Sequence, residues 1–236
     1  NIYDLTGIED FISLRELNCQ TNSISQLDVS NNLLLEDLIC QFNSISSLDL
    51  SNNTQLDFLL AQYNQLTHLD LTNTNLTYLN IKSNLLDTIT MGNVSNIRYF
   101  NAAINQFTEL DLTAFTGLKY IFAENNALTS LNIKNGNNTI IVVFNSTNNQ
   151  NLYCIEVDNS QYSSSNWTSV DSWSTFSNNC SLPGCMDPLA CNYNPLAWVN
   201  DSSCNYPVSS TSTQTHCDFY VFNGDTLSLT GTYYDT

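Results

Sequence analysis

The amino-acid sequence predicts a repeat solenoid built mainly of short parallel β-strands. Apolar residues recur along the chain with a step of 20 or 21 residues, and self-similarity at a fixed period is the signature of stacked repeats. Within each repeat, apolar residues at offsets 0, 3 and 5 are followed by an asparagine at offset 8. Because one coil cannot bury its own apolar side chains, the coils have to stack on one another.

Seven coils follow from this alignment. The first positions of the repeat are Leu14, Leu35, Leu56, Leu76, Ile97, Leu118 and Thr139. The second are Leu17, Leu38, Leu59, Leu79, Phe100, Ile121 and Val142, and the third are Cys19, Cys40, Ala61, Ile81, Ala102, Ala123 and Phe144. Six coils continue to Asn22, Asn43, Asn64, Asn84, Asn105 and Asn126. We expect each of these amides to hydrogen-bond the turn backbone or the next asparagine in the stack.

The second half of each coil repeats the apolar pattern. In the segment 45–53, Ile45, Leu48 and Leu50 are again followed by an asparagine, Asn53. Alternating apolar residues are typical of a strand with one buried face. The sequence therefore predicts two short strands per coil, one on each long side.

Charge and hydropathy exclude several classes of partner. Only 5 Lys and Arg residues stand against 22 Asp and Glu, for a net charge of −17. Such a chain repels nucleic acid and anionic membranes. No apolar run approaches the roughly 20 residues that span a bilayer, so no direct membrane insertion is expected. The first residues lack a signal-peptide pattern, and we expect the chain to be an internal part of a longer precursor.

The LxxLxLxxN unit resembles the leucine-rich-repeat proteins secreted by the Bacteroidota. This resemblance implies an extracellular or cell-surface location. It also implies a lead-in at 1–13, repeats at 14–158 and a C-terminal cap at 159–183. Cys154 and Cys180 bracket the cap, and we expect them to be bonded to each other, which would stabilise the end of the solenoid by about 3 kcal/mol.

A small cysteine-rich module is expected at 184–207. It resembles the short GCxDPxAxNYxPxAxxDDGSC module of the same secreted proteins, which is similar to the calcium-binding repeats of thrombospondin type 3. The resemblance implies a Cys185–Cys204 disulfide and oxygen ligands for Ca²⁺ from Asp187, Asn192, Asn194 and Asp201. Asn200 and Ser202 depart from the pattern and weaken a calcium cage. We favour the alternative, a disulfide-pinned loop whose Asp and Asn side chains cap turns.

The remaining tail divides into a linker at 208–216 and the start of a β-module at 217–236. The second part resembles the CDSYxWNGxxYxxSGxY opening of a small β-module in these proteins, and Asn223-Gly224 predicts a hairpin turn. The partners of Cys191 and Cys217 stay open. They could bond each other, or Cys217 could bond a cysteine further along the precursor.

Two further cysteines, Cys19 and Cys40, occupy an interior position of the repeat. We favour buried free thiols over a disulfide between neighbouring coils, since in-register parallel neighbours suit bridging geometry poorly.

The candidate binding residues alternate with the buried positions and are expected to face outward. The row at offset 2 is Glu16, Asp37, Phe58, Tyr78, Tyr99, Tyr120 and Ile141, and the row at offset 4 is Asn18, Ile39, Leu60, Asn80, Asn101, Phe122 and Val143. Phe42, Tyr63 and Ile104 join them at offset 7. An apolar patch of this size indicates a recognition surface. The alternative is ordinary cross-strand aromatic stacking.

A second row is acidic and consists of Asp28, Asp49, Asp70 and Asp111, continued by Asn132. We favour turn capping and solvation over cation binding for this row. The two histidines, His68 and His216, belong to no nucleophile–base signature.

These patterns together predict a non-catalytic binding or adhesion module that recognises an extracellular protein or glycan. The alternative function is a structural subunit of a surface fibre or layer that associates with copies of itself through the same face.

Overall fold

The computed structural model describes residues 1–181, 183–195, 197–206, 220–222 and 225–227. The chain divides into two compact units, Asn1–Asn179 and Cys180–Thr236. The first unit is a solenoid of parallel strands, which confirms the predicted fold class.

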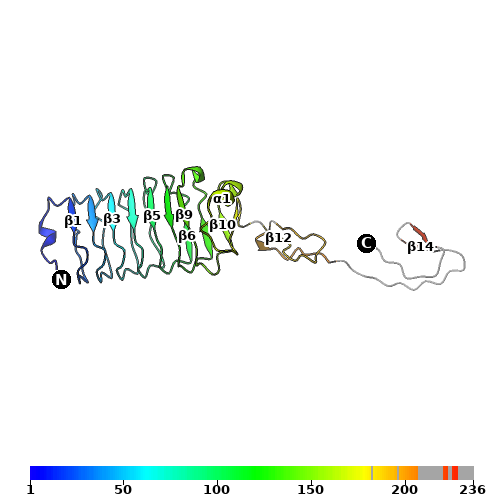
Figure 1. Ribbon diagram of the computed structural model, residues 1–236, viewed down its shortest axis with the longest axis horizontal. Helices are drawn as coiled ribbons and strands as arrows, with labels where there is room; N and C mark the ends of the chain where they lie inside the picture. Colours follow the sequence, from blue (N-terminus) through cyan, green and yellow to red (C-terminus); the bar gives the residue numbers. More distant parts are fainter. Residues whose placement is uncertain (182, 196, 207–219, 223–224, 228–236) are drawn as a thin grey trace. The chain divides into compact units, whose positions relative to one another are not determined.

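In the described part of the chain, one long side of the solenoid is a sheet of seven parallel strands in register. Their order along the sheet is β1 (Glu16–Asn18), β2 (Asp37–Ile39), β3 (Phe58–Leu60), β4 (Tyr78–Asn80), β5 (Tyr99–Asn101), β7 (Tyr120–Phe122) and β9 (Val143–Asn145). The strands lie side by side along the first unit (Figure 1). Each has its central residue buried, because alternate residues of a strand point to opposite faces. The outer residues of each strand are thereby free to form a continuous surface.

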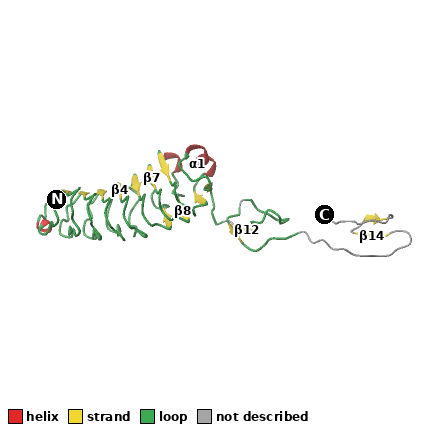
Figure 2. Ribbon diagram, turned by 60° about the horizontal axis from the view of Figure 1, so that its bottom comes forward, coloured by secondary structure: helices red, strands yellow, loops and turns green. Residues whose placement is uncertain are grey.

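The second long side is a sheet only in the later coils. Its strands are β6 (Glu109–Asp111), β8 (Ser130–Asn132), β10 (Cys154–Glu156) and β11 (Thr175–Ser177). In the earlier coils, the described segments of the second side form no strand. They make a single isolated β-bridge, between Asp70 and Thr90. The expectation of two strands per coil is therefore confirmed for the later coils and wrong for the earlier ones. Figure 2 shows the same contrast, with long loop segments on that side.

The offset-8 asparagines connect neighbouring coils through the backbone. Asn64 is typical: its Nδ2 donates to the carbonyl oxygens of Cys40 at 3.0 Å and Ala61 at 3.2 Å. Its Oδ1 accepts from the amide of Ile45 at 3.0 Å. Asn43, Asn84, Asn105 and Asn126 repeat this geometry. The predicted bonding to turn backbone is thus confirmed, and these amides join two adjacent coils through main-chain atoms instead of bonding the next asparagine.

The seventh coil differs from its predicted alignment by two residues. The structure pairs Phe144, not Val142, with Ile121, and Val142 is 66% exposed. A short 3-10 helix, η2 (Asn138–Ile140), takes up the extra length. The run 141–144 is apolar throughout and offers several registers. The register adopted is the one in which Asn149 bonds three backbone groups of two coils, as the earlier asparagines do.

Both ends of the first unit carry segments outside the strand pattern. The N-terminal end contains η1 (Ile8–Asp10). The C-terminal end contains α1 (Ser160–Asn166), followed by Trp167, whose ring packs 4.8 Å from the ring of Phe144. The carboxylate of Asp171 accepts from the backbone amides of residues 148 and 149. These contacts cover apolar and polar groups that a further coil would otherwise have to satisfy.

The second unit contains two short strand pairs. β12 (Pro183–Gly184) is parallel to β13 (Val199–Asn200), and the Cys185–Cys204 disulfide closes this module. β14 (Tyr220–Phe222) is antiparallel to β15 (Asp225–Leu227), as a hairpin requires. The predicted turn residues 223–224, the linker 208–216 and Cys217 lie outside the described residues. No helix among the described residues is long and apolar enough to cross a membrane.

Candidate binding face

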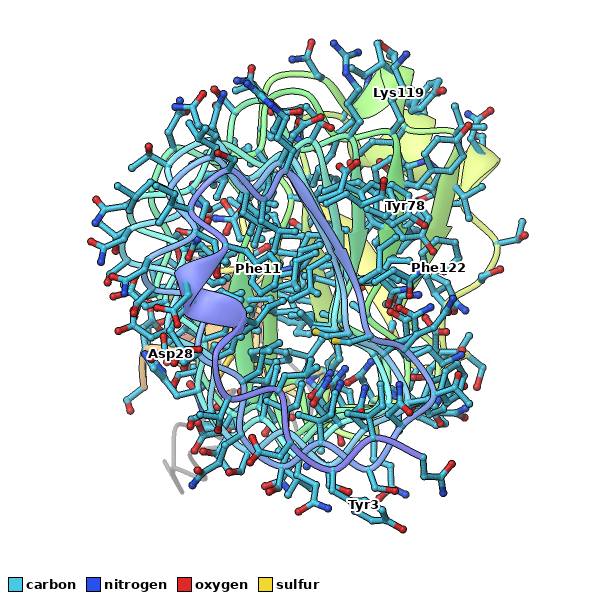
Figure 3. The ribbon with its side chains drawn as sticks, turned by 90° about the vertical axis from the view of Figure 1, so that its left-hand side faces the viewer. Tyr3, Phe11, Asp28, Tyr78, Lys119 and Phe122 are labelled. Atoms are coloured by element: carbon cyan, nitrogen blue, oxygen red, sulfur yellow. A yellow bond between two sulfur atoms is a disulfide. The ribbon has the colours of Figure 1, made fainter. Side chains whose placement is uncertain are left out.

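The outer side of the seven-stranded sheet carries a row of stacked aromatic rings. The rings of Phe58 and Tyr78 lie 4.6 Å apart, and those of Tyr78 and Tyr99 lie 4.1 Å apart with an angle of 3° between their planes. Tyr99 then makes tilted contacts with Tyr120 at 6.0 Å and Phe122 at 5.6 Å. The parallel register causes this, because it places each ring directly beside its equivalent in the next coil. Figure 3 shows Tyr78 and Phe122 on this outer side.

Stacking determines what the row presents to solvent. The faces of the Phe58, Tyr78 and Tyr99 rings cover one another, and all three side chains are half-buried. Burial and a hydrogen bond with Tyr99 raise the pKa of Tyr78 to about 12, so the hydroxyl stays protonated. Cross-strand stacking thus describes the geometry, while the ring edges and hydroxyl groups form the outer surface.

The flanking row at offset 4 is partly apolar and partly polar. Ile39, Leu60 and Phe122 are half-buried on the outer face. Asn80 and Asn101 lie between them, and their side-chain oxygens accept from the backbone amides two residues on. These hydrogen bonds hold the two short side chains close to the backbone.

Two of the expected row members take other positions in the seventh coil. Ile141 is buried in the core, and Val143 lies opposite Tyr120 at offset 2. The place opposite Phe122 is taken by Asn145. The two-residue change of alignment explains both corrections.

Phe42, Tyr63 and Ile104 form a separate group at the turn that follows the strands. All three have a left-handed backbone, with φ of 56° or 57°. The rings of Phe42 and Tyr63 stack at 4.5 Å with an angle of 8°. They are exposed, as expected, but belong to the corner of the coil and not to the strand rows.

Glutamines occupy offset 6 in the first three coils of the outer face, and they were not predicted from the sequence. Gln41 donates from Nε2 to Oε1 of Gln20 at 2.5 Å, and Gln62 follows in the next coil. The same alternation that identified the aromatic row contains this signal, since offsets 2, 4 and 6 all point outward.

Charged residues at offset 1, which the sequence pattern did not predict as part of the site, flank the aromatic row along the edge of the sheet. Glu36 and Asp57 precede β2 and β3, and Arg98 and Lys119 precede β5 and β7. Among the described residues the ion pairs are Arg15–Glu36 and Lys134–Glu156, so neither Arg98 nor Lys119 has an ionic partner there.

Carboxylates crowd the first three coils of this face. Asp37 lies in register with Glu16 on the neighbouring strand. Partial burial, followed by repulsion from Glu16, Asp57 and Glu36, raises the pKa of Asp37. At offsets 1 and 2 the face therefore carries mainly carboxylates over coils one to three, aromatic rings in the centre, and the two cations over coils five and six; Arg15 at offset 1 of coil one and Glu124 at offset 6 of coil six have the opposite sign.

The second acidic row caps turns, as favoured from the sequence. Asp28, Asp49, Asp70 and Asp111 each accept from the backbone amide two residues on, at 2.8–2.9 Å. Asn132 does the same at 3.0 Å. Hydrogen bonds from the side chain and backbone of Ser30 lower the pKa of Asp28, which keeps the carboxylate ionised and accepting.

The cysteines divide by environment. Cys19 and Cys40 are buried free thiols, as favoured from the sequence. Cys154 and Cys180 are both disulfide-bonded, and Cys185 is bonded to Cys204 as the resemblance implied. Cys191 is exposed with a free thiol.

Three of the four expected calcium ligands, Asp187, Asn192 and Asp201, accept hydrogen bonds within their own module. Asp187 accepts from the Leu189 amide and from the hydroxyl of Tyr206. Asn192 accepts from the Asn205 amide, and Asp201 accepts from the Ser203 amide. Within the described residues, no group of three or more His, Cys, Asp or Glu comes together to hold a metal ion. Two of the expected ligands are asparagines, so calcium binding stays a prediction.

The second side of the solenoid holds an open hollow of about 290 Å³ between two coils. It is lined by the segments 87–89 and 107–111 and by Met91. At its edge, Nδ1 of His68 lies 3.3 Å from Oγ1 of Thr88. Both residues are exposed, and His216 lies outside the described residues.

No protein-family model matches the chain, and no curated protein matches it. Among solved structures, the chain is similar to the functional domain of InlJ from Listeria monocytogenes, which includes a cysteine ladder. The sequence identity is 26% and the TM-score is 0.39. The match covers 66% of this chain and 42% of that chain, so this chain spans less than half the length of the protein it matches.

Proposed function

We propose that the chain is a non-catalytic binding or adhesion module of an exported cell-surface protein. Its recognition surface is the aromatic face, which we define as Phe58, Tyr78, Tyr99, Tyr120 and Phe122 with the flanking Ile39 and Leu60. The observation that supports this function is the continuous row of aromatic edges across four coils, joined by apolar side chains. Aromatic side chains supply rigid contact area with little loss of rotamer freedom.

The stacking favours a protein as the partner class over a glycan. A sugar ring packs against an exposed aromatic face, and here the faces of Phe58, Tyr78 and Tyr99 cover one another. Their edges and hydroxyl groups instead offer a flat surface with hydrogen-bonding ability, which suits the apolar centre and polar rim of a protein interface.

The test is binding of the full chain to an array of purified extracellular proteins and oligosaccharides. Replacing Tyr78, Tyr99 and Tyr120 by Ser should abolish binding, since such anchors dominate interface energies. The matched control is Phe42→Ser with Tyr63→Ser, which removes a stacked pair at the corner and should preserve binding. Unchanged binding by the triple variant, with circular dichroism showing an intact fold, would refute the proposal.

A second candidate is a structural subunit that self-associates through the aromatic face. The charge distribution along the face favours it. Coils one to three carry carboxylates, of which Glu36 is paired with Arg15, while Arg98 and Lys119 in coils five and six have no ionic partner among the described residues.

A further inference from the structure

The in-register sheet lets the outer residues be compared coil by coil. We number the coils one to seven by their strands β1, β2, β3, β4, β5, β7 and β9. A two-fold axis that is parallel to the strands and lies over β4, in the plane between two facing copies, would place coil two against coil six of a second copy, and coil three against coil five. Such an isologous contact requires the face to be complementary to itself.

The residues at offset 1 meet this requirement. Under that axis Glu36 faces the partner's Lys119, and Asp57 faces the partner's Arg98. Thr77, the offset-1 residue of coil four, faces its own copy. Arg98 and Asp57 are exposed, and Glu36 and Lys119 are half-buried. Asp57, and Glu36 in addition to its own Arg15, thus each meet a cation of the partner, twice in each dimer.

Several residues at offsets 2 and 4, next to this charged edge, are also complementary to the residues that they face. Asp37 faces the hydroxyl of the partner's Tyr120, which can donate to a carboxylate. Phe58 faces the partner's Tyr99, and Ile39 faces the partner's Phe122. The contact therefore has an apolar and aromatic centre and a charged edge at offset 1, in keeping with the polar rim of protein interfaces. Lys82 meets its own copy at the far end of the strand, where its long side chain can extend into solvent.

We propose that the aromatic face binds a second copy of this chain, antiparallel to the first, about a two-fold axis at β4. The inference rests on the proposed function and names the partner. An arrangement with the two solenoids parallel would stack the acidic coils one to three of the two copies on each other, and their like net charge disfavours it. The two-fold contact closes on itself, so it forms a dimer and not an open fibre.

The size of the face sets the strength of this dimer. Seven coils at about 4.8 Å, and about five residues of strand at 3.3 Å, give a face of roughly 550 Å² per copy. A standard stable interface buries about 800 Å² per partner. We therefore expect a weak and reversible dimer, in which the rim charges determine orientation more than affinity.

The test is a charge exchange followed by sedimentation equilibrium up to near-millimolar protein. One variant carries Glu36→Lys and Asp57→Lys, and the other carries Arg98→Glu and Lys119→Glu. The wild-type chain should dimerise and each variant alone should be monomeric, because both ends of its face then have one sign. An equimolar mixture should form a heterodimer. The experiment is run in about 0.15 M salt, where the screening length is about 8 Å. This salt weakens the repulsion between the two negatively charged chains and leaves the ion pairs in direct contact effective.

Glu109→Lys, on the exposed second side, is the control and should dimerise like the wild-type chain. A monomeric wild-type chain, a monomeric mixture, or variants that dimerise alone would each overturn the inference. If the wild-type chain stays monomeric while the tyrosine variant loses array binding, the proposed function stands without this partner. If Arg98→Glu with Lys119→Glu abolishes binding to an acidic oligosaccharide on the array and leaves association unchanged, the cationic end serves that ligand instead.

Discussion

The asparagine ladder makes a prediction whose size follows from its hydrogen bonds. Asn64 is only 9% exposed, and its replacement by alanine removes three bonds. The amide of Ile45 then has no partner. The carbonyl oxygens of Cys40 and Ala61 each keep one, because Asn43 and Asn84 also donate to them.

The expected cost follows from this difference. An orphaned buried amide costs about 1–3 kcal/mol, and each carbonyl that loses a second donor costs about 0.5–1 kcal/mol. Asn64→Ala should therefore destabilise the chain by about 2–5 kcal/mol. Asn64→Asp keeps the acceptor for Ile45 but loses both donations, so it should be destabilised at pH 7 and partly recover when acid protonates the new carboxyl group.

The assay is urea unfolding followed by circular dichroism. Asn73→Ala serves as control, because its Nδ2 makes one exposed bond, to the carbonyl of Ser51; it should cost less than about 1 kcal/mol. Equal midpoints for the two alanine variants would refute the reasoning that the buried amides hold the coils together.

Three other perturbations are expected to give defined results. Ile104→Asn should stabilise the chain by about 1 kcal/mol in thermal melts, because a β-branched residue is strained in the left-handed region of the backbone. Asn125 and Asn148 occupy the equivalent position of later coils, with φ of 57° and 60°. The control Ile104→Val should bring no gain in stability, and a gain equal to that of asparagine would contradict the strain argument. Burial raises the pKa of Cys19 to about 11, so the stability that this neutral thiol contributes is complete below the unfolded thiol pKa of about 8.5 and is lost as the pH rises towards 11. The free energy of unfolding should therefore be lower at pH 10.5 than at pH 8, and Cys19→Ala should reduce that difference. An equal pH dependence in Cys19→Ala would count against this assignment. Cys185→Ser should destabilise the 184–207 module by about 3 kcal/mol and leave the melting of the solenoid unchanged. Calcium bound to this module should raise the melting temperature of the module in the wild-type chain and not in Asp187→Asn. A melting temperature that EDTA does not change would count against a calcium site.

The fold could be predicted from the sequence because the repeat encodes it locally. Leu38, Leu59 and Leu79 recur at the coil spacing, and their burial is the result of stacking equal coils. The seventh coil was misaligned for a related reason. Its apolar run 141–144 satisfies several registers, and the choice depends on Asn149 bonding the carbonyl of Ala123 in the coil before, which no local pattern contains.

The candidate site was predicted in part. The alternation placed Tyr78 and Tyr99 on the outer face, but it could not show that their rings would stack with their faces covered. Nor did it reveal the charged rim. Asp57 and Arg98 are 41 residues apart in the numbering, and their significance appears only when the sheet register places them at equivalent positions of the third and fifth coils.

The sequence by itself determined the solenoid, its period, its buried thiols and the rows that face solvent, because each follows from spacing along the chain. Only the tertiary structure decided the register of the last coil, the absence of second-side strands among the described residues of the earlier coils, and the mutual covering of the aromatic rings. These depend on contacts between coils, and the energy of such a contact is a property of two segments that the sequence keeps apart.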